Sequence, residues 1–329
     1  MTKRLALALS LVQKQIESFC NMLYRKTGIN HYWVIKNCQP IIDHIEKVNF
    51  SRSARNITTF DFTTLYTFLD HVDILTSMNE VIDLAFKKAY RSTPFISVYN
   101  TCASWSTNPH DKTFTFNVDS LKSSLKFVLE NAYFSVGNSN FKQTIGIPIG
   151  VDCAPPIANL TLFRYEYNYI SSLYRSDYKR AYKLRGCFRL MDDITSINDD
   201  GVFQSDIPLI YPSSLTLKKE NTGCLIADVL DLTIECHTPT KTFSYCLYDK
   251  RDKFNFNIVN FPHLSGNISC SCAYGVFTSQ VLTYRRLCSS VAEFKVRLDH
   301  LTSKLCSQGY SRGRLSVMLD QLSKSIQYK

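Results

Sequence analysis

The chain has 329 residues, of which 45% are hydrophobic and 20% are charged, a balance typical of a globular protein with enough apolar material for a core. Polar or charged residues interrupt every apolar run well before the roughly 18 residues that a membrane-spanning helix needs, which excludes such a helix. The net charge of +10 is spread along the chain and suits a polyanionic partner, but it does not identify one.

The cysteines and the N-terminal segment indicate an intracellular protein. The twelve cysteines include no Cys-x-x-Cys pair, and Cys270-Ser-Cys272 has no His or second Cys pair at zinc spacing nearby. We therefore expect reduced, buried thiols. The apolar run Leu5–Val12 is similar to the centre of a signal peptide, but polar residues follow it at helical spacing, so we expect an amphipathic helix.

The first half of the chain predicts mainly helices. We expect helices over residues 1–27, 40–48, 73–91, 120–133 and 156–174; the third repeats apolar residues at helical spacing and the last has proline near its first turn. Residues 57–66 are rich in β-branched and aromatic side chains, which predicts a strand. Residues 92–119 contain prolines and asparagine, and we expect an irregular insertion or a hairpin there.

The second half of the chain predicts strands and then helices. Residues 186–199 indicate a hairpin, and residues 216–219, 229–234 and 241–248 indicate strands of a small antiparallel sheet. From about residue 275 the pattern is helical. One helical face is expected to carry Phe277, Val281, Tyr284, Leu287 and Val291. Strands followed by a helical module predict an α+β fold that changes class near residue 265.

Two adjacent carboxylates, Asp192 and Asp193, lie at the tip of the predicted hairpin. Like charges so close repel each other and raise the pKa of one, a cost that a divalent cation such as Mg²⁺ removes. A polar turn is the commoner explanation for an isolated Asp-Asp pair. Asp61, on the predicted strand, adds a third acid, and three acids on rigid strands can hold two metal ions for a phosphoryl transfer.

The segment Gly146–Asn159 places two glycines and several prolines before a predicted helix. Glycines let the backbone approach a flat, bulky ligand, and a helix N-terminus favours phosphate. A glycine–proline loop that only links two elements is the commoner case for such a segment taken alone.

Three segments together resemble the palm motifs of reverse transcriptases. They are Asp61-Phe-Thr-Thr-Leu-Tyr-Thr67, Gly146-Ile-Pro-Ile-Gly150 with Ala154-Pro155, and Arg189-Leu-Met-Asp-Asp193, and their order and separations also agree. Their amino-acid sequences are most similar to those of Penelope-like retroelement enzymes, whose motifs have sequences close to DFSTLYT, GIPMGTNCAP and RYLDD. The resemblance covers roughly residues 25–315.

The resemblance implies a right-hand polymerase with an α+β fold. Residues 1–56 would form partial fingers, residues 57–265 a palm with an antiparallel sheet and the insertion 92–119, and residues 266–329 a helical thumb. The implied activity is that of an RNA-directed DNA polymerase of a retroelement, which adds dNTPs to a primer 3′-hydroxyl with two Mg²⁺ ions, or Mn²⁺ instead. An RNA template and a DNA primer would be the partners, no membrane is involved, and we expect a nuclear location.

The resemblance also implies a role for individual residues. Asp61 and Asp192 would ligate both metals with Asp193 in support, and Tyr66 would be the steric gate that excludes a ribose 2′-hydroxyl. The other implied substrate-binding residues are Gly146, Pro148 and Gly150 under the nascent base pair, and Lys219, or with less support Lys218, near the triphosphate. A core aromatic and a solvated strand-edge lysine are the structural alternatives for Tyr66 and the lysines.

Two further segments are expected to contact nucleic acid. Tyr284, Arg285 and Arg286 would follow the minor groove from the thumb, and the alternating aromatic and charged residues of Tyr248–Phe261 would grip the primer. A solvated helix face and a half-buried hairpin are the corresponding structural alternatives.

The chain also departs from the family pattern. Leu190 replaces a tyrosine, Val151-Asp152 replaces Thr-Asn, and Ile149 replaces methionine. About sixty residues precede Asp61, fewer than we expect for complete fingers, and we expect no GIY-YIG endonuclease module. Lys26, Lys36, Arg52 and Arg55 are the candidate substitutes for the basic residues of the fingers.

Two other functions stay open at this point. The first is a truncated or catalytically decayed module that binds RNA–DNA hybrid, which the short fingers, Leu190 and Asp152 favour. The second is another palm-fold enzyme such as a nucleotide cyclase, against which the thumb-like C-terminus and Tyr66 argue.

Overall fold

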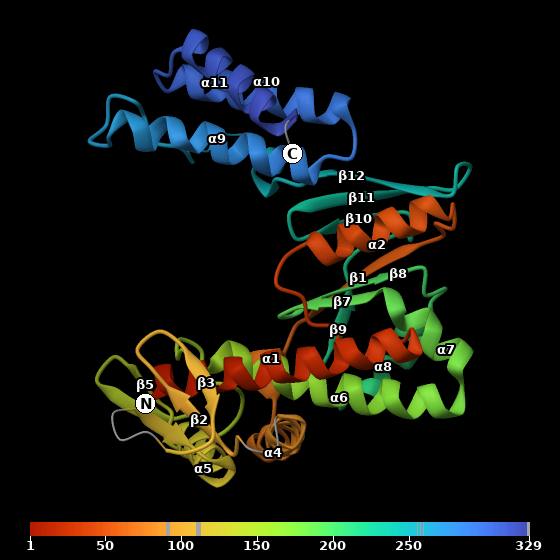
Figure 1. Ribbon diagram of the computed structural model, residues 1–329, viewed down its shortest axis with the longest axis vertical. Coiled ribbons are helices and arrows are strands. Elements are labelled where there is room, and N and C mark those ends of the chain that lie inside the picture. Colours follow the sequence, from red (N-terminus) through yellow and green to blue (C-terminus); the bar gives the residue numbers. More distant parts are fainter. Residues whose placement is uncertain (90–92, 110–112, 255, 257, 259, 328–329) are drawn as a thin grey trace. The chain divides into compact units, whose positions relative to one another are not determined.

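Figure 1 shows a computed structural model of the chain, which describes residues 1–89, 93–109, 113–254, 256, 258 and 260–327. The chain divides into two compact units, one made of Met1–Asn37 and Asn56–Thr222 and the other of Cys38–Arg55 and Gly223–Lys329. Both units mix helices with antiparallel sheets, as the α+β prediction requires. The boundaries of fingers, palm and thumb stay predictions, because compactness does not assign those roles.

The first unit is built on a four-stranded antiparallel sheet with the order β7-β8-β1-β9. Its strands are β1 (Ile57–Phe62), β7 (Cys187–Leu190), β8 (Asp193–Ile197) and β9 (Leu217–Lys219). Three helices lie along one side of this sheet, namely α1 (Thr2–Thr27), α6 (Ala154–Ser176) and α8 (Val202–Ile210) (Figure 1). Phe203 of α8 joins sheet and helices, since its ring lies 5.1 Å from that of Phe60 and 5.8 Å from that of Trp33.

The remaining elements of the first unit follow β1 and α6 in the sequence. They are α3 (Leu65–Phe68), α4 (His71–Lys88), the sheet β3-β2-β4 (Ala103–Ser106, Phe95–Val98 and Phe114–Phe116), α5 (Val118–Glu130), the hairpin β5–β6 (Tyr133–Val136 and Ser139–Lys142) and α7 (Tyr178–Lys183). A reciprocal cap fixes the start of α5, because Asn117 and Ser120 each accept from the other's backbone amide.

The second unit joins α2 (Gln39–Phe50) to the C-terminal part of the chain. Its sheet contains β10 (Ile226–Val229), β11 (Leu232–His237) and β12 (Thr242–Leu247), and its helices are α9 (Cys270–Leu287), α10 (Val291–Ser307) and α11 (Arg312–Gln327). The side chain of Asn49 holds α2 to β12: it accepts from the Phe243 amide at 2.6 Å and donates to the Phe243 carbonyl at 2.8 Å. Phe277, Val281 and Leu305 are buried between the three helices.

Most predicted helices and the central hairpin are confirmed, but several boundaries are wrong. The strand predicted over residues 57–66 ends at Phe62, and Tyr66 lies in the short helix α3 instead. The hairpin β5–β6 was not predicted, and the helix predicted to residue 133 ends at Glu130 instead. Residues 217–219 pair with β1 rather than with the small sheet, and residues 229–234 span a turn in which Leu230 has a φ of 55°.

The last predicted helical face is also shorter than expected. Val291 is 71% exposed because a new helix, α10, begins there, whereas Phe277, Val281, Tyr284 and Leu287 are buried as predicted. All twelve cysteines are described and none of them forms a disulfide, but only some are buried; Cys102, Cys224, Cys270 and Cys272 are exposed. Among the described residues, no helix combines the length and the hydropathy that crossing a membrane requires.

Candidate functional site

A row of four residues crosses the end of the central sheet. Asp61 lies opposite Asp193 on one side and opposite Lys218 on the other, and Asp193 in turn lies opposite Leu190. Directly opposed residues of antiparallel strands share a face, so these four side chains emerge on the same face of the sheet. Asp193 and Lys218 are exposed there, and Asp61 is partly exposed.

Asp192 lies in the two-residue turn that joins β7 to β8. Its carbonyl accepts from the amide of Phe62 at 3.2 Å, which ties the turn to β1 one residue beyond Asp61. The structure thus brings all three predicted carboxylates to the same end of the same sheet. The register of the β-ladder fixes the spacing of the Asp61 and Asp193 Cβ atoms, because directly opposed residues on paired strands lie at a set distance.

Beneath the turn lies a buried ion pair between Arg189 and Glu166 of α6. The Arg189 Nε donates to one Glu166 oxygen at 2.5 Å and a terminal nitrogen donates to the other at 3.2 Å. The same guanidinium donates to the Met191 carbonyl at 3.1 Å and to the Asn159 side chain at 2.9 Å. Burial opposes the charge of Arg189, but the Glu166 carboxylate outweighs this effect and the pKa of Arg189 lies above its ordinary value.

This network supports a strained turn. Met191 has a φ of 58°, a conformation that costs a residue with a side chain about 1–2 kcal/mol. Arg189 holds the Met191 carbonyl, and the Asn159 amide contacts the Met191 sulfur at 3.6 Å. The sequence interpretation missed the role of Glu166; the available signal was a glutamate on an otherwise apolar helix face, among Leu162, Phe163 and Ile170.

The predicted floor loop docks on the backbone that follows Asp61. The Gly146 amide donates to the Leu69 carbonyl at 2.7 Å, and the Ile147 amide donates to the Tyr66 carbonyl at 2.9 Å. Gly146 has a φ of 82°, and a Cβ there would lie 2.3 Å from the Tyr66 carbonyl oxygen. Only glycine therefore allows the loop and α3 to approach so closely.

A pocket of about 350 Å³ lies between Tyr66 and this loop. Its walls are Tyr66, Ile149, Gly150, Val151, Asp152, Ala154 and Pro155. Burial raises the pKa of the half-buried Tyr66 hydroxyl, and the negative charge of Asp192 raises it further, so Asp192 lies within electrostatic reach of the ring. Gly150 and Tyr66 thus line one pocket, whereas Pro148 is buried within the loop. Exposed Asp152 accepts from the Thr2 hydroxyl at 3.1 Å.

The two candidate lysines lie on opposite faces of the sheet. Lys219 pairs with Phe60, whose side chain packs into the helix-covered core, and Lys218 pairs with Asp61. Lys218 is exposed and lies 3.6 Å from Glu220. The register therefore places Lys218, the less favoured candidate, on the carboxylate face; a role in triphosphate binding stays a prediction for both.

The predicted nucleic-acid contacts of the helical module lie in the second unit. Tyr284 is only 8% exposed, because it packs in the core of α9, α10 and α11, and this burial argues against contact with a ligand. Arg285 and Arg286 are exposed. Residues 255, 257 and 259 of the predicted primer-gripping segment, Tyr248–Phe261, lie outside the described residues.

The three acids Asp61, Asp192 and Asp193, which we call the carboxylate row, match the donor chemistry of Mg²⁺, which prefers a few carboxylate oxygens. In the part of the chain that the structure describes, however, no group of three or more His, Cys, Asp or Glu side chains converges closely enough to hold a metal ion. Asp61 and Asp193 thus share a face of the sheet and Asp192 lies in the adjoining turn, but the three carboxylates do not converge on a common centre. Metal binding stays a prediction.

Comparison with known proteins identifies the fold. No family model and no curated protein matches the sequence. The structure is similar to telomerase from Candida albicans in complex with a TWJ fragment of telomeric RNA, with a TM-score of 0.53, 13% identity and coverage of 85% of this chain and 42% of that chain. It is also similar to telomerase from Candida tropicalis in complex with a TWJ fragment of telomeric RNA, with a TM-score of 0.50, 13% identity and coverage of 96% and 47%.

The chain spans less than half the length of these telomerase chains. At such low identity the likeness establishes the fold alone: a mixed helix and sheet fold, shared with part of a telomerase chain. This fold agrees with the reverse-transcriptase resemblance of the three motifs.

Replacing Gly146 by alanine tests the contact between the floor loop and α3. Gly146→Ala should lower the free energy of unfolding by about 3 kcal/mol or more, because the added methyl group clashes with the Tyr66 carbonyl oxygen and because alanine adopts the positive φ of this position only at a cost. Gly150→Ala is the matched control: it has a φ of 96° but no atom within 4 Å of the added Cβ, and should cost about 1–2 kcal/mol. Urea unfolding measures both, and equal losses would contradict the close approach.

Replacing Glu166 by glutamine tests the support under the turn. Glu166→Gln leaves the buried Arg189 charge unpaired and should lower the free energy of unfolding by about 3–5 kcal/mol. Tyr211→Phe is the control, since it removes only a hydroxyl that donates to Glu166 at 2.9 Å and should cost about 1 kcal/mol. If both variants unfold at the same urea concentration, the ion pair does not support the turn.

Proposed function

We propose that the chain is an RNA-directed DNA polymerase, a reverse transcriptase of a Penelope-like retroelement. The observation that carries this proposal is the register that sets Asp61 opposite Asp193 with Asp192 bonded to the next residue of β1. The fold shared with part of telomerase supports it. The fingers, palm and thumb assignments and a nuclear location belong to the same proposal.

The reaction joins a primer 3′-hydroxyl to a dNTP. The primer 3′-hydroxyl gives up its proton to water as its oxygen forms a bond to the α-phosphorus, the bond from that phosphorus to the oxygen of the β-phosphate breaks, and pyrophosphate leaves. Asp61 and Asp192, with Asp193 in support, would hold two Mg²⁺ ions, or Mn²⁺ instead. When bound, the metals stabilise the charge that develops on the reacting oxygens. The carboxylates contribute by being held in place on strands and a turn before substrate arrives.

The pocket beside the carboxylates would bind the incoming nucleotide. Tyr66 lines it with Gly150 and Ala154, and the half-buried ring lies within the field of Asp192. In that place Tyr66 would exclude a ribose 2′-hydroxyl, while Gly146 keeps the loop close to it. Lys218 lies on the same sheet face as Asp61 and is the lysine that the register favours for the triphosphate.

An RNA template paired with a DNA primer is the proposed macromolecular partner. The net charge of +10 suits a polyanion, and the telomerase structures that share the fold contain telomeric RNA. Arg285 and Arg286, both exposed on α9, are the proposed contacts of the helical module with the duplex backbone.

A second candidate function is a module that binds RNA–DNA hybrid without catalysis. Two observations favour it. The acids among the described residues do not converge on a metal position, and Asp152 adds a negative charge to the pocket wall. Hybrid binding that weakens with salt, without incorporation of any nucleotide, would establish this function.

Primer extension tests the catalytic role of Asp192. On an RNA template with a DNA primer, dNTPs and Mg²⁺, Asp192→Asn should reduce extension by about a hundredfold or more, because it removes a metal-binding charge but keeps the shape of the side chain. Asp320→Asn is the matched control, since Asp320 is exposed on α11, outside the carboxylate row and outside the pocket, and it should retain activity. Unchanged extension by Asp192→Asn would refute the mechanism.

Ribonucleotide incorporation tests the role of Tyr66. Tyr66→Ala opens the pocket where the ring stands and should raise the ratio of NTP to dNTP incorporation by about tenfold or more. Tyr66→Phe keeps the ring and should keep the selectivity of the unaltered chain. Equal selectivity of the alanine and phenylalanine variants would show that the ring is only a packing residue.

A further inference from the structure

Three tyrosines form an exposed series on the first unit, which we call the tyrosine ladder: Tyr174, Tyr178 and Tyr182. Tyr174 lies near the end of α6 and the other two lie on α7, with exposed fractions of 36%, 49% and 41%. Neighbouring ring centroids are 6.0 Å apart in both pairs, and the rings of Tyr178 and Tyr182 are stacked at 27°. The Arg185 guanidinium lies 3.9 Å from the centroid of the Tyr182 ring and continues the series.

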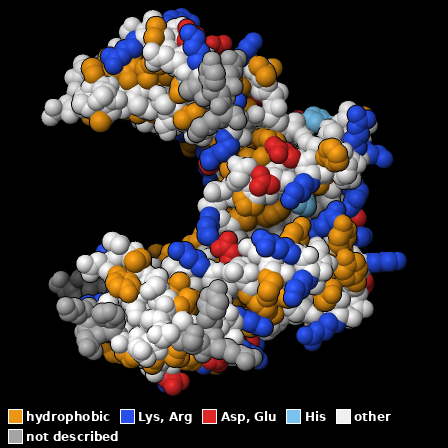
Figure 2. All heavy atoms as spheres, in the orientation of Figure 1, with side chains coloured by type: hydrophobic (Ala, Val, Ile, Leu, Met, Phe, Trp, Pro, Cys, Tyr) orange, Lys and Arg blue, Asp and Glu red, His pale blue; other side chains and the backbone are white. Residues whose placement is uncertain are grey.

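Basic residues lie between the tyrosines of the ladder in the sequence. Residues 174–185 contain five basic side chains and one acid, Asp177, which accepts from the Arg180 amide. Arg180 is bound to the buried Asp206, and Lys183 lies 3.3 Å from Asp200, so these two charges are compensated. Arg175 and Lys179 are exposed. Figure 2 shows basic and hydrophobic side chains side by side where α7 lies.

The end of α1 extends this basic and aromatic surface. The Tyr178 hydroxyl donates to the Thr27 carbonyl at 3.4 Å, which fixes α7 beside the last turn of α1. That turn carries Arg25 and Lys26, both exposed. The ladder therefore has positive charge along it and at the neighbouring helix end.

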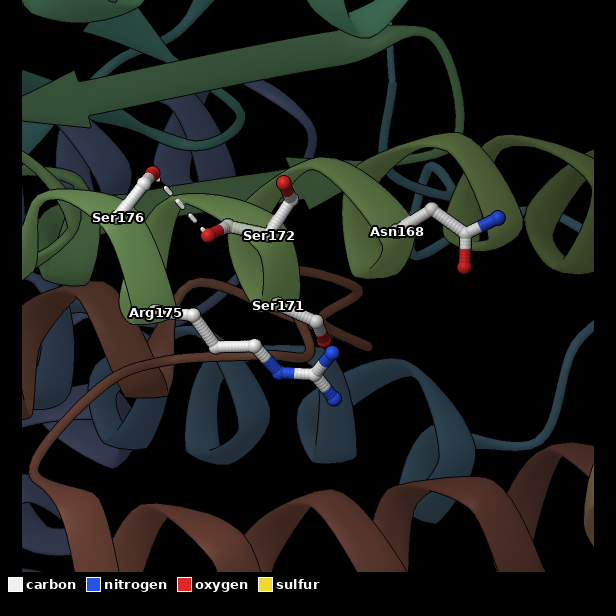
Figure 3. A pocket seen from close by; sticks show the side chains of 5 residues that line it. All are labelled: Asn168, Ser171, Ser172, Arg175 and Ser176. Atoms are coloured by element: carbon white, nitrogen blue, oxygen red, sulfur yellow. Dashed lines mark hydrogen bonds between the residues drawn. The ribbon is translucent and has the colours of Figure 1, made fainter.

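A groove with phosphate-binding chemistry lies on α6 beside the ladder. It has a volume of about 440 Å³ and is lined by Asn168, Ser171, Ser172, Arg175 and Ser176. In Figure 3 the Arg175 guanidinium lies beside the Ser171 hydroxyl. Every lining side chain can donate a hydrogen bond and none is acidic, a set that suits a phosphate oxygen. Arg175 thus lies in the groove and next to Tyr174 in the chain.

We propose that the tyrosine ladder, with Arg175 and Lys179, is a binding surface for single-stranded nucleic acid. Exposed aromatic rings offer stacking to any base, and interleaved lysine and arginine follow the phosphates. The surface differs from the carboxylate row, because α6 packs on the sheet side that holds Phe60 and Arg189, whereas Asp61 and Asp193 emerge on the other side. It needs no catalysis and does not rest on the polymerase proposal.

Fluorescence anisotropy with the full chain tests this surface. The probes are a 5′-fluorescein-labelled single-stranded RNA of mixed sequence, the same sequence as DNA, and the corresponding duplex. Arg175→Glu with Lys179→Glu should raise the Kd for the single strands by about tenfold or more, and Tyr178→Leu should raise it by a similar factor. Lys14→Glu with Lys87→Glu is the matched control, since it makes the same charge change at exposed lysines away from the ladder and should have a small effect.

The outcomes separate this proposal from its rivals and from the polymerase proposal. Loss of binding in the ladder variants alone, at unchanged melting temperature, supports the surface, and a difference between the RNA and DNA arms identifies its preferred strand. Equal loss in the control double variant, binding that ignores Tyr178→Leu, or no binding by the unaltered chain would overturn it. Polyglutamate that competes as well as RNA would overturn it in favour of an acidic protein partner.

Primer extension by the ladder variants, together with single-strand binding by Asp192→Asn, keeps the two proposals apart. The ladder variants leave Asp61, Asp192 and Tyr66 untouched, so the chemistry of the carboxylate row does not depend on them. Single-strand binding measured in an Asp192→Asn background should equal that of the unaltered chain. Binding lost with Asp192→Asn and kept in the ladder variants would place the single strand at the carboxylates and overturn the ladder assignment.

Discussion

The buried ion pair between Arg189 and Glu166 is the interaction on which the candidate site depends. An unpaired guanidinium inside a protein is costly, so this arginine requires the carboxylate and the Asn159 groups that α6 supplies. Once paired, it holds the carbonyl of Met191 and so the left-handed turn that presents Asp192. The same helix begins beside the floor loop, with Ala154 in the pocket wall. One helix thereby connects the hairpin and the loop.

Because side chains alternate along the strands, the residues that support the site and the acids lie on opposite faces of the sheet. Arg189, Ile194 and Phe60 form the row that faces the helices, and the adjacent row carries Asp193 and Asp61. A shift of one residue in any strand would exchange these rows and bury the acids. The sheet therefore needs its exact pairing for the acids to be accessible at all. Burial raises the pKa of Tyr66, the charge of Asp192 raises it further and that of Arg189 lowers it, so the ring lies within the field of both residues.

The sequence predicted the elements that depend on local pattern and missed those that depend on distant contacts. The hairpin around Asp192 was predicted from the short apolar runs on either side of it, and the helix α6 from the proline near its first turn. The resemblance favoured Lys219 over Lys218, and the register that sets Lys218 on the face of Asp61 is not visible in one strand alone. Tyr66 was placed on a strand because aromatic residues favour strands, although the chain turns after Phe62. The partnership of Arg189 with a residue 23 positions away has no local signal.

The central claim is that the carboxylate row is a metal-binding catalytic site. Mapping the position of a bound metal ion by backbone cleavage tests this claim most directly. Iron(II) can replace Mg²⁺, and with ascorbate and peroxide it produces hydroxyl radicals that cut the backbone near the bound ion. The proposed function predicts cuts at residues around Asp61 and Asp192, which join across β1 and the β7–β8 turn, and their loss in excess Mg²⁺. Cuts elsewhere in the chain, or none at either aspartate, would contradict it.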